Sequence, residues 1–393
     1  MIIITALFWA SAACVVYTYA GYPLLLMAIS SFRQLRSDWH KVSGAGERRV
    51  TASGALPSVA VLVSAFNEER FIAERVQNLL DQDYPAELLR IYIGSDASSD
   101  RTGEILRRLA CPQLTFTDFP MRRGKASVIN DLAAKATEDV LVFTDANTFF
   151  EPAAVRRLVR HFDTPDIGCV CGELRLVRSA RTGDNQDHFY WRYERFLKFF
   201  ESRIGALLGA NGGVYALRRR DYQPIPVDTI VDDFCISMQV IESGRRCVYD
   251  PEAVATEVIP ESIGDEFRRR VRIGMGNYQS LRRFVGLLNP RYGAVAFTFA
   301  SHKVMRWLAP HCMVLALLCN VALVASPAYA AWLVAQLGFY GLAFVGWWLS
   351  RTGSAPRLLR LPLFFVSMNV GLLVGFWKFT TSVSSGAWTR SAR

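Results

Sequence analysis

The sequence predicts an α/β fold with a mainly parallel sheet, flanked by about one membrane-spanning helix on its N-terminal side and three on its C-terminal side. Three observations lead to this prediction. Residues 1–32 contain no charged side chain, and no Asp or Glu follows Glu266, although Arg and Lys continue to the last residue. Between these regions strand and helix signals alternate, which is the pattern of a parallel sheet with helices on both faces.

Length and charge restrict the class further. With 393 residues and a formal net charge of +10, the chain is long enough for one α/β domain of about 250 residues with membrane segments at either end. Such uneven charge favours contact with anionic lipid headgroups. A soluble nucleic-acid-binding protein would not need apolar runs long enough to cross a bilayer, so nucleic acid is not an expected partner. The eight cysteines show no spacing typical of a zinc site or a disulfide framework.

The apolar runs predict four spans. Ile2–Ile29 is uncharged and longer than the roughly 7 to 15 apolar residues of a signal-peptide core, so it is expected to be a retained helix. Three further runs fit a hydrocarbon core of about 30 Å, at residues 307–325, 328–349 and 361–379. Tyr292–Ala300 is apolar but too short to span, so residues 285–306 are expected to form an interfacial segment.

Basic residues predict the orientation. They follow the first span and lie between the third and fourth spans, at Arg33, Arg36, Lys41, Arg48, Arg49, Arg351, Arg357 and Arg360. The positive-inside rule places both regions in the cytoplasm, with both chain termini outside. Arg390 and Arg393 oppose this orientation but are outnumbered. The expected division is a linker over residues 33–56, a cytoplasmic domain over 57–284 and the C-terminal spans within 307–393.

In the first part of the domain, five strands and the four helices between them are predicted, and a further strand is expected at residues 214–217. The strands are expected at residues 59–66, 91–96, 114–119, 140–146 and 167–174, and the helices at 68–81, 99–110, 125–136 and 152–162. The carboxyl ends of parallel strands meet at one edge of a sheet, where open α/β sheets bind their ligands. Polar residues that follow the strands are therefore the candidates for a site.

The strongest candidate is Asp145, which closes the run V-L-V-F-T-D-A-N from Val140 to Asn147. A carboxylate at the end of an apolar strand must be solvated or paired, and a divalent ion that bridges two phosphates would satisfy it. Asp145 and Asn147 offer the hard oxygen ligands that Mg²⁺ or Mn²⁺ prefers. This predicts an enzyme with a phosphorylated donor.

Two other nucleotide motifs are excluded. A phosphate loop would need glycine and Ser or Thr where Phe119 and Ala126 accompany Gly124-Lys125. Gly274-x-Gly276 has Gln279 in place of the third small residue of a dinucleotide fingerprint, and it does not follow a strand. ATPase and nicotinamide chemistry are therefore not expected.

The remaining motifs carry a resemblance in their order along the chain. They are S-A-F-N-E-E from Ser64, G-S-D-A-S-S-D from Gly94, R-R-G-K from Arg122, D-A-N from Asp145, V-D-D-F from Val231 and R-R-V-R from Arg269. No single motif is specific, but the series resembles the membrane-integrated branch of family 2 glycosyltransferases, which includes cellulose, hyaluronan and chitin-oligosaccharide synthases. The resemblance spans residues 57–276. V-D-D-F and R-R-V-R stand where the family has T-E-D and Q-x-x-R-W.

The resemblance implies a Rossmann-like glycosyltransferase-A domain, a nucleotide-sugar donor of the UDP type, a metal ion and inversion at the anomeric carbon. It implies that Asp233 removes the acceptor proton with Asp232 in support, and that Asp96 contacts the nucleoside. The implied donor-binding residues are Asn67, Glu68, Asp96, Lys125, Asp145, Arg269 and Arg272, with Lys125 and Arg272 on the diphosphate. The implied acceptor-binding residues are Asn211, Gly212 and Ile273. Adjacent residues at a helix start point about 100° apart, so only one of Asp232 and Asp233 can face the reacting atom.

Structural roles remain as alternatives for several of these residues. Asp96 and Asp100 could cap a helix, and Asp232 and Asp233 could favour a helix N-terminus. Lys125 could be a solvated helix residue. The arginines from Arg269 could form a cationic membrane face. The loop Gly209–Gly213 could be a plain turn.

The predicted function is transfer of a sugar to a membrane-presented saccharide in surface or extracellular polysaccharide synthesis, at a bacterial inner membrane. The alternative is glycolipid synthesis on ceramide, diacylglycerol or a polyprenyl phosphate. A non-catalytic scaffold or transporter is disfavoured because no intramembrane carboxylate marks a transport path. Two departures from the family matter: Asn147 replaces the second Asp of D-x-D, and Ile273 replaces the Trp that borders the acceptor. Since four spans are also few for a polymer channel, short products are expected, and a long polymer would need an oligomer or an export partner.

Overall fold

The computed structural model describes residues 1–42, 55–109, 111–177, 188–258, 263–351 and 356–381. These form two compact units. The helical unit comprises described residues within 1–29, 188–193 and 263–381, and the sheet unit comprises those within 30–177 and 194–258. Most of the linker predicted at residues 33–56 lies outside the described residues.

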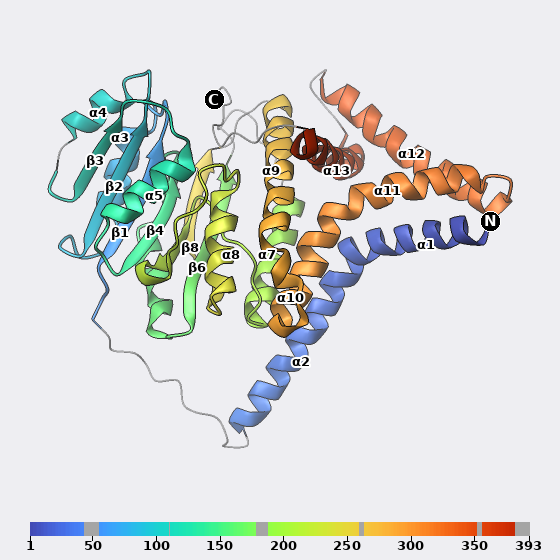
Figure 1. Cartoon of the computed structure of the whole chain (residues 1–393), viewed down its shortest axis with the longest axis horizontal. Coiled ribbons are helices and arrows are strands. Elements are labelled where there is room, and N and C mark those ends of the chain that lie inside the picture. Colours follow the sequence, from blue (N-terminus) through green and yellow to red (C-terminus); the bar gives the residue numbers. More distant parts are fainter. Residues whose placement is uncertain (43–54, 110, 178–187, 259–262, 352–355, 382–393) are drawn as a thin grey trace. The chain divides into compact units, whose positions relative to one another are not determined.

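The sheet unit contains an eight-stranded mixed sheet in the order β3-β2-β1-β4-β7-β6-β8-β5 (Figure 1). The strands are β1 Val59–Ala65, β2 Leu89–Asp96, β3 Leu114–Phe119, β4 Val140–Asp145, β5 Thr148–Phe150, β6 Ile167–Val177, β7 Tyr215–Arg218 and β8 Arg246–Val258. β3, β2, β1 and β4 run parallel, and β7 runs antiparallel to both β4 and β6. The predicted α/β class with a mainly parallel sheet is confirmed.

Helices connect the strands of this unit. They are α3 Ile72–Leu80, α4 Thr102–Arg108, α5 Lys125–Lys135, α6 Ala154–Val159 with a 3₁₀ turn at Arg160–Asp163, and α8 Asp232–Glu242. α2 Tyr22–Val42 and α7 His188–Arg203 each have residues in both units. The predicted helices start up to four residues early, because residues 68–71 and 99–101 form turns in place of a first helical turn.

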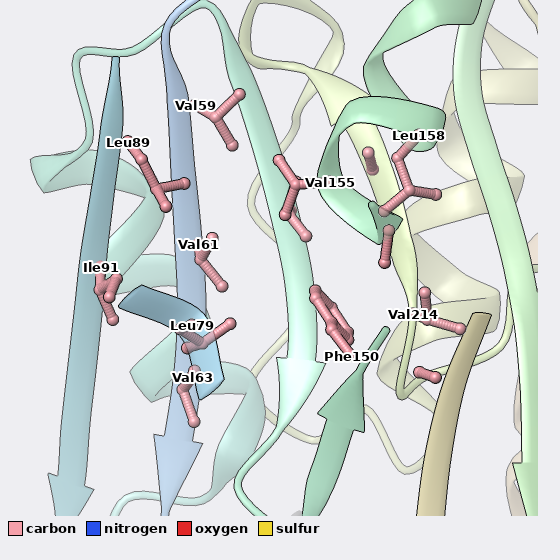
Figure 2. Close-up of a cluster of buried hydrophobic side chains, with 14 of the residues drawn as sticks. Val59, Val61, Val63, Leu79, Leu89, Ile91, Phe150, Val155, Leu158 and Val214 are labelled. Atoms are coloured by element: carbon pink, nitrogen blue, oxygen red, sulfur yellow. The ribbon is translucent and has the colours of Figure 1, made fainter. Parts of the chain in front are cut away.

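The core explains why the strands are so apolar. Val59, Val61 and Val63 of β1 are fully buried and lie beside Leu89 and Ile91 of β2 (Figure 2). Beyond β4 the same cluster continues through Phe150, Val155, Leu158 and Val214. Strands that are covered on both faces read as nearly continuous apolar runs. This core fixes the strand ends where the polar loops begin.

The helical unit contains helices long and apolar enough to cross a membrane. The helices of this unit are α1 Ile2–Val16, α9 Ile263–Phe284, α10 Ala294–Thr298, α11 Met305–Ala322, α12 Pro327–Ser350 and α13 Arg357–Thr381, with π-helical turns at Tyr17–Gly21 and Phe299–Val304 and 3₁₀ turns at Val285–Leu288 and Pro290–Tyr292. By length and composition, the described residues hold four candidate spans, at Ile2–Trp39, Ala294–Ala322, Pro327–Ser350 and Leu358–Thr381. The predicted number of one before the domain and three after it is confirmed.

Two span boundaries differ from the predicted ones. The first candidate span runs past Ile29 to Trp39. The predicted span ended at Ile29 because the following helical turns of α2 contain polar and charged residues. The second candidate span begins at Ala294 and passes without interruption through the π-helical turn, although the sequence prediction started this span at Trp307. Residues 294–306 of the predicted interfacial segment therefore belong to one helical run with α11.

A close crossing of two helices accounts for Gly274, one of the two glycines of the rejected dinucleotide motif. α9 meets α13 where a Cβ on Gly375 would lie 2.7 Å from the backbone nitrogen of Met275, and one on Gly274 would lie 3.1 Å from the carbonyl oxygen of Gly371. Small residues of this kind let two helix backbones approach closely. Beside this crossing the Arg270 guanidinium lies 4.4 Å from the centroid of the Phe364 ring.

Candidate active site

The carboxyl ends of β1, β2 and β4 meet at one edge of the sheet unit. Ser64 of β1 is in register with both Gly94 of β2 and Asp145 of β4, so the loops that follow these strands start at the same level. α5 begins at Lys125, directly after a loop that contacts the end of β2. This arrangement gathers the charged residues of four sequence motifs.

Lys125 is the centre of the charged cluster. Its Nζ donates to Asp145 Oδ1 at 2.7 Å and lies 3.1 Å from Asp232 Oδ2. Burial acts to lower the pKa of Lys125, but Asp145 and Asp232 outweigh it, so the pKa of this ammonium is raised. The lysine is therefore a permanent positive charge between two carboxylates, and it is not a solvated helix residue.

Asp232 and Asp233 have different surroundings, as their spacing at a helix start predicts. Asp232 pairs with Lys125, whereas Asp233 Oδ1 accepts a hydrogen bond from the backbone N–H of Phe234 at 2.9 Å. The other oxygen of Asp233 faces Gly212, where an added Cβ would lie 3.1 Å from Oδ2. Burial, and then the charge of Asp232, raise the pKa of Asp233 to about 6, against the opposing effect of Lys125. A carboxylate with this pKa is suited to accept a proton near neutral pH.

Asp96 shapes the loop that presents Lys125. Its buried carboxylate accepts hydrogen bonds from the backbone N–H groups of Arg123, at 2.7 Å, and Gly124, at 2.9 Å. Gly124 has a φ of 86°, which favours glycine, and its next residue starts α5. The helix-cap alternative does not describe Asp96, since these bonds lead to the α5 loop and not to α4. The predicted contact with a nucleoside remains a prediction.

Asn67 and Glu68 join the loop after β1 to the loop after β2. The Asn67 side-chain oxygen accepts from the backbone N–H of Ser99 at 2.8 Å, and the N–H of Glu68 donates to Thr102 Oγ1 at 2.8 Å. Asp100 accepts from the N–H of Thr102 at 2.9 Å, so it caps the start of α4 as its alternative role predicted. Both predicted donor-binding residues thus lie at the site edge, and part of their hydrogen bonding is used between loops.

Asn147 has a partner that the sequence did not reveal. Its buried amide nitrogen donates to Glu257 Oε1 at 3.3 Å, and Glu257 lies on β8, next to β5. β5 and β8 were not among the predicted strands, because β5 has only three residues and β8 contains Pro251 and several charges. No local pattern links two residues 110 positions apart.

The donor set is compatible with a divalent ion of the magnesium type. Asp145 offers a carboxylate that is about one-third exposed, whereas Asn147, two residues later, is buried and its amide nitrogen donates to Glu257. The predicted role of Asn147 as a metal ligand remains a prediction. Among the described residues, no group of three or more His, Cys, Asp or Glu could hold a metal by itself. Mg²⁺ characteristically binds to one or two carboxylates together with substrate phosphates. An ion here would therefore complete its coordination with donor oxygens.

The Gly209–Gly213 loop is fixed by side chains on both sides. Asn211 Nδ2 donates to the carbonyl of Gly172 at 2.9 Å, and Lys198 of α7 donates to the other end of the same amide. At Gly209, φ is 82° and an added Cβ would lie 2.7 Å from the Phe234 ring. Asn211 to Val214 thus form a turn, closed by the hydrogen bond from the N–H of Val214 to the carbonyl of Asn211, and Gly212 in this turn lies beside Asp233. The acceptor-binding role of Asn211 and Gly212 remains a prediction.

The remaining predicted residues lie on α9 of the helical unit. Arg269 and Ile273 are half-buried there, and Arg272 is exposed. The cluster described above is formed by the sheet unit alone. The roles predicted for these three residues remain predictions.

Arg75 is a further charged residue that sequence reasoning missed. It is fully buried on α3, among the apolar positions Ile72, Val76 and Leu79. Burial lowers its pKa to about 9, against the opposing attraction of Asp145. The signal was present: an arginine at a core position of an amphipathic helix requires buried partners.

Comparisons with a family model, with curated proteins and with solved structures show what this chain is similar to. Residues 60–223 match the family model described as Glycosyl transferase family 2. The poly-beta-1,6-N-acetyl-D-glucosamine synthase of Staphylococcus aureus (strain COL) is 28% identical over 235 residues, which cover 58% of this chain and 56% of that protein. An N-acetylglucosaminyltransferase of Rhizobium leguminosarum bv. viciae is 26% identical over 274 residues, covering 63% of this chain and 64% of that protein. The chain thus spans between half and two-thirds of the length of these relatives.

A solved structure shares the fold. A mannosyltransferase from Pyrobaculum calidifontis, in complex with GDP-Man and Mn²⁺, superimposes with a TM-score of 0.71 at 22% sequence identity. The superposition covers 96% of this chain and 99% of that one. At this identity the likeness establishes the glycosyltransferase-A-like fold and nothing finer.

Proposed function

We propose, for a chain whose residues 60–223 carry a family 2 glycosyltransferase domain, that it transfers a sugar from a nucleotide donor to a membrane-presented saccharide acceptor. The observation that carries the proposal is Lys125, which bridges Asp145 and Asp232 while Asp233 lies beside the Gly209–Gly213 loop. The names of the similar synthases support an N-acetylhexosamine as the sugar and a polysaccharide as the product. A UDP-sugar is the proposed donor.

Asp233 is the proposed general base. Its carboxylate takes the proton of an acceptor hydroxyl bound at Gly212, and the hydroxyl oxygen forms a bond to the anomeric carbon of the donor. The bond from this carbon to the diphosphate oxygen breaks, and the electron pair leaves with the nucleoside diphosphate. A single displacement of this kind inverts the anomeric configuration. Its pKa of about 6 leaves Asp233 largely deprotonated at neutral pH.

Lys125 is the proposed diphosphate contact, supported by Arg269 and Arg272 of α9. A lysine at the N-terminus of a helix adds its charge to the positive end of the helix dipole. Its ion pair with Asp232 also fixes the residue next to the base. A divalent ion, Mg²⁺ or Mn²⁺, held by Asp145 and Asn147, would supply charge neutralisation for the leaving diphosphate.

The four apolar helices support an integral membrane enzyme, and the basic residues that flank them support a cytoplasmic catalytic domain. A bacterial inner membrane is the proposed location. A lipid acceptor such as diacylglycerol, ceramide or a polyprenyl phosphate is the second candidate. It is favoured by Ile273, since an aliphatic side chain gives a growing sugar chain less stacking surface than tryptophan does.

The test is a donor panel. Purified full-length protein in lipid nanodiscs is incubated with UDP- and GDP-sugars and Mn²⁺ or Mg²⁺, and release of nucleoside diphosphate is measured. We expect metal-dependent release from a UDP-N-acetylhexosamine, lost in Asp233→Asn. Absence of release from every donor, with saccharide and lipid acceptors supplied, would reject the enzyme and leave a scaffold or transporter.

A further inference from the structure

Arg75 anchors a buried polar network behind the site. Its Nη2 donates to Thr144 Oγ1 at 2.8 Å, and its Nη1 donates to the side-chain oxygen of Asn78. Its guanidinium carbon lies 4.4 Å from the centroid of the Phe150 ring. Arg75 and Thr144 are at most 1% exposed. None of these groups takes part in the proposed chemistry.

The network holds both flanks of the D-A-N turn. Thr144 directly precedes Asp145 in β4. Asn78 binds both backbone groups of Phe150 in β5: its Nδ2 donates to the carbonyl, and its Oδ1 accepts from the N–H, each at 2.9 Å. The chain that carries Asp145 and Asn147 is therefore held at its start and its end by neighbouring residues of α3.

The same network reaches the acceptor loop. Thr144 Oγ1 accepts from Arg75 and donates to the carbonyl oxygen of Gly213 at 2.8 Å. Gly213 follows Gly212, which faces the Asp233 carboxylate. One hydroxyl thus links the proposed metal-binding turn to the loop beside the proposed base.

We infer that Arg75 is a positioning residue which, through Thr144, sets the relative placement of the Asp145 turn and the Gly212–Gly213 loop. This inference rests on the proposed function and deepens it. A buried arginine is costly unless its donors find partners. Nη1 and Nη2 of Arg75 donate to Asn78 on the same helix and to Thr144 of β4, whereas Nε has no hydrogen-bond partner among the described residues. Partners of this kind, behind a ligand, orient it for its ion.

Thr144 allows a mild test. Thr144→Val keeps the shape but removes the hydroxyl, and Thr144→Ser retains the hydroxyl. Arg75→Met removes the anchor itself. Arg218→Met is the control. Arg218 also donates to backbone carbonyls and stacks on a ring, that of Phe162, but it pairs with Val140 at the opposite end of β4.

Binding of UDP with Mn²⁺ is measured by titration calorimetry, with the thermal midpoint of each variant as the readout of folding. For Thr144→Val and Arg75→Met we expect the dissociation constant to rise by about 10-fold to 100-fold. The half-saturating Mn²⁺ concentration should rise in parallel. Thr144→Ser should bind like the wild type, and Arg218→Met should lose thermal stability without losing affinity.

Two results would overturn the inference. Folded Thr144→Val that binds UDP and Mn²⁺ as the wild type does would remove the link through the hydroxyl. Equal losses of UDP affinity in Arg218→Met and Arg75→Met would mean that Arg75 contributes only to the general stability of the fold. If Arg75→Met does not fold, the comparison of Thr144→Val with Thr144→Ser tests the inference by itself. A wild-type chain that releases no nucleotide from any donor would instead reject the proposed function, and this inference with it.

Discussion

Gly212 and the Asp233 carboxylate lie so close that a methyl group on Gly212 would be 3.1 Å from Oδ2. This spacing is tighter than most contacts of a real Cβ, so either the loop or the carboxylate would have to move. The backbone of the acceptor loop therefore passes directly beside the proposed base. A hydroxyl bound to that backbone would be within reach of the carboxylate.

Gly212→Ala should slow transfer and leave donor binding unchanged. The added methyl displaces the Asp233 carboxylate or the loop by a few tenths of an ångström, and small misplacements of reacting groups can cost roughly 10-fold to 100-fold in rate. Single-turnover rates and UDP affinity measure the two effects separately. Gly286→Ala is the control, since nothing lies within 4 Å of a Cβ at that position. Unchanged turnover in Gly212→Ala would contradict the proximity argument.

Asp145→Ala should abolish metal-dependent donor turnover, and Asp145→Asn should be almost as damaging. Asp145 supplies the negative charge of the proposed metal site, and both changes also remove one of the two carboxylates that pair with Lys125. Titration of Mn²⁺ in nucleotide-release and binding assays measures the loss. Asp118→Asn is the control, because it removes an exposed carboxylate of β3 that pairs with Arg107 of α4. Metal-stimulated release by Asp145→Ala would reject the metal assignment.

Asp233→Asn should retain donor binding but lose transfer by about 100-fold or more, which is the usual contribution of a general base. Asp232→Asn should have a smaller effect on transfer, since Asp232 contacts Lys125. Initial rates of transfer and UDP affinities, measured for both variants, show which of the two aspartates acts as the base. Greater damage in Asp232→Asn would mean that the two roles are exchanged, and two harmless variants would reject the catalytic interpretation.

The rate should depend on pH through Asp233. Only the deprotonated carboxylate accepts a proton, so kcat/KM should fall as the pH drops below about 6. Because Asp232 raises the pKa of Asp233, Asp232→Asn should move this limb to lower pH. Stability follows the opposite sign: a raised carboxyl pKa stabilises the folded state below the ordinary value of 3.8, and this contribution is lost as pH rises through about 6. A pH–rate profile without an acidic limb would contradict the assignment.

The product should be short, or a single added sugar, because Ile273 stands where processive synthases carry tryptophan. An aliphatic side chain supplies only part of the stacking that holds a growing chain between additions. Size analysis of product made with excess donor measures this, and Ile273→Trp should lengthen the product. A polymer of high molecular weight formed by the purified wild-type chain would overturn the expectation.

The strands of the sheet differ in how far the sequence predicts them. β1, β2 and β4 are short, largely apolar runs with polar residues at or just after their ends, so both their class and the importance of Asp145 were visible. β8 was not predicted, because Pro251 and the charged residues of this strand interrupt its apolar pattern. Its pairing with β6 also shifts register between Gly172 and Glu173. Such irregular pairing has no local signature.

The contacts within the site show the same division. The types and order of Lys125, Asp145 and Asp233 were readable as motifs. The bonds from Asp96 to the backbone of Arg123 and Gly124, and from Asn147 to Glu257, depend on loops that meet only in the folded chain. Arg75 was missed for a different reason. Its place on the core face of α3 was visible in the sequence, but the partners that a buried arginine requires were not.

The crossing of α9 and α13 has a mechanical consequence. Where Gly274 meets Gly371 and Gly375, no side chain separates the two backbones, so neither helix can slide or rotate past the other without a clash. Any tilt that a change of bilayer thickness imposes on α13 must therefore be shared by α9. Arg269, Arg270 and Arg272 of α9 would then move together with α13.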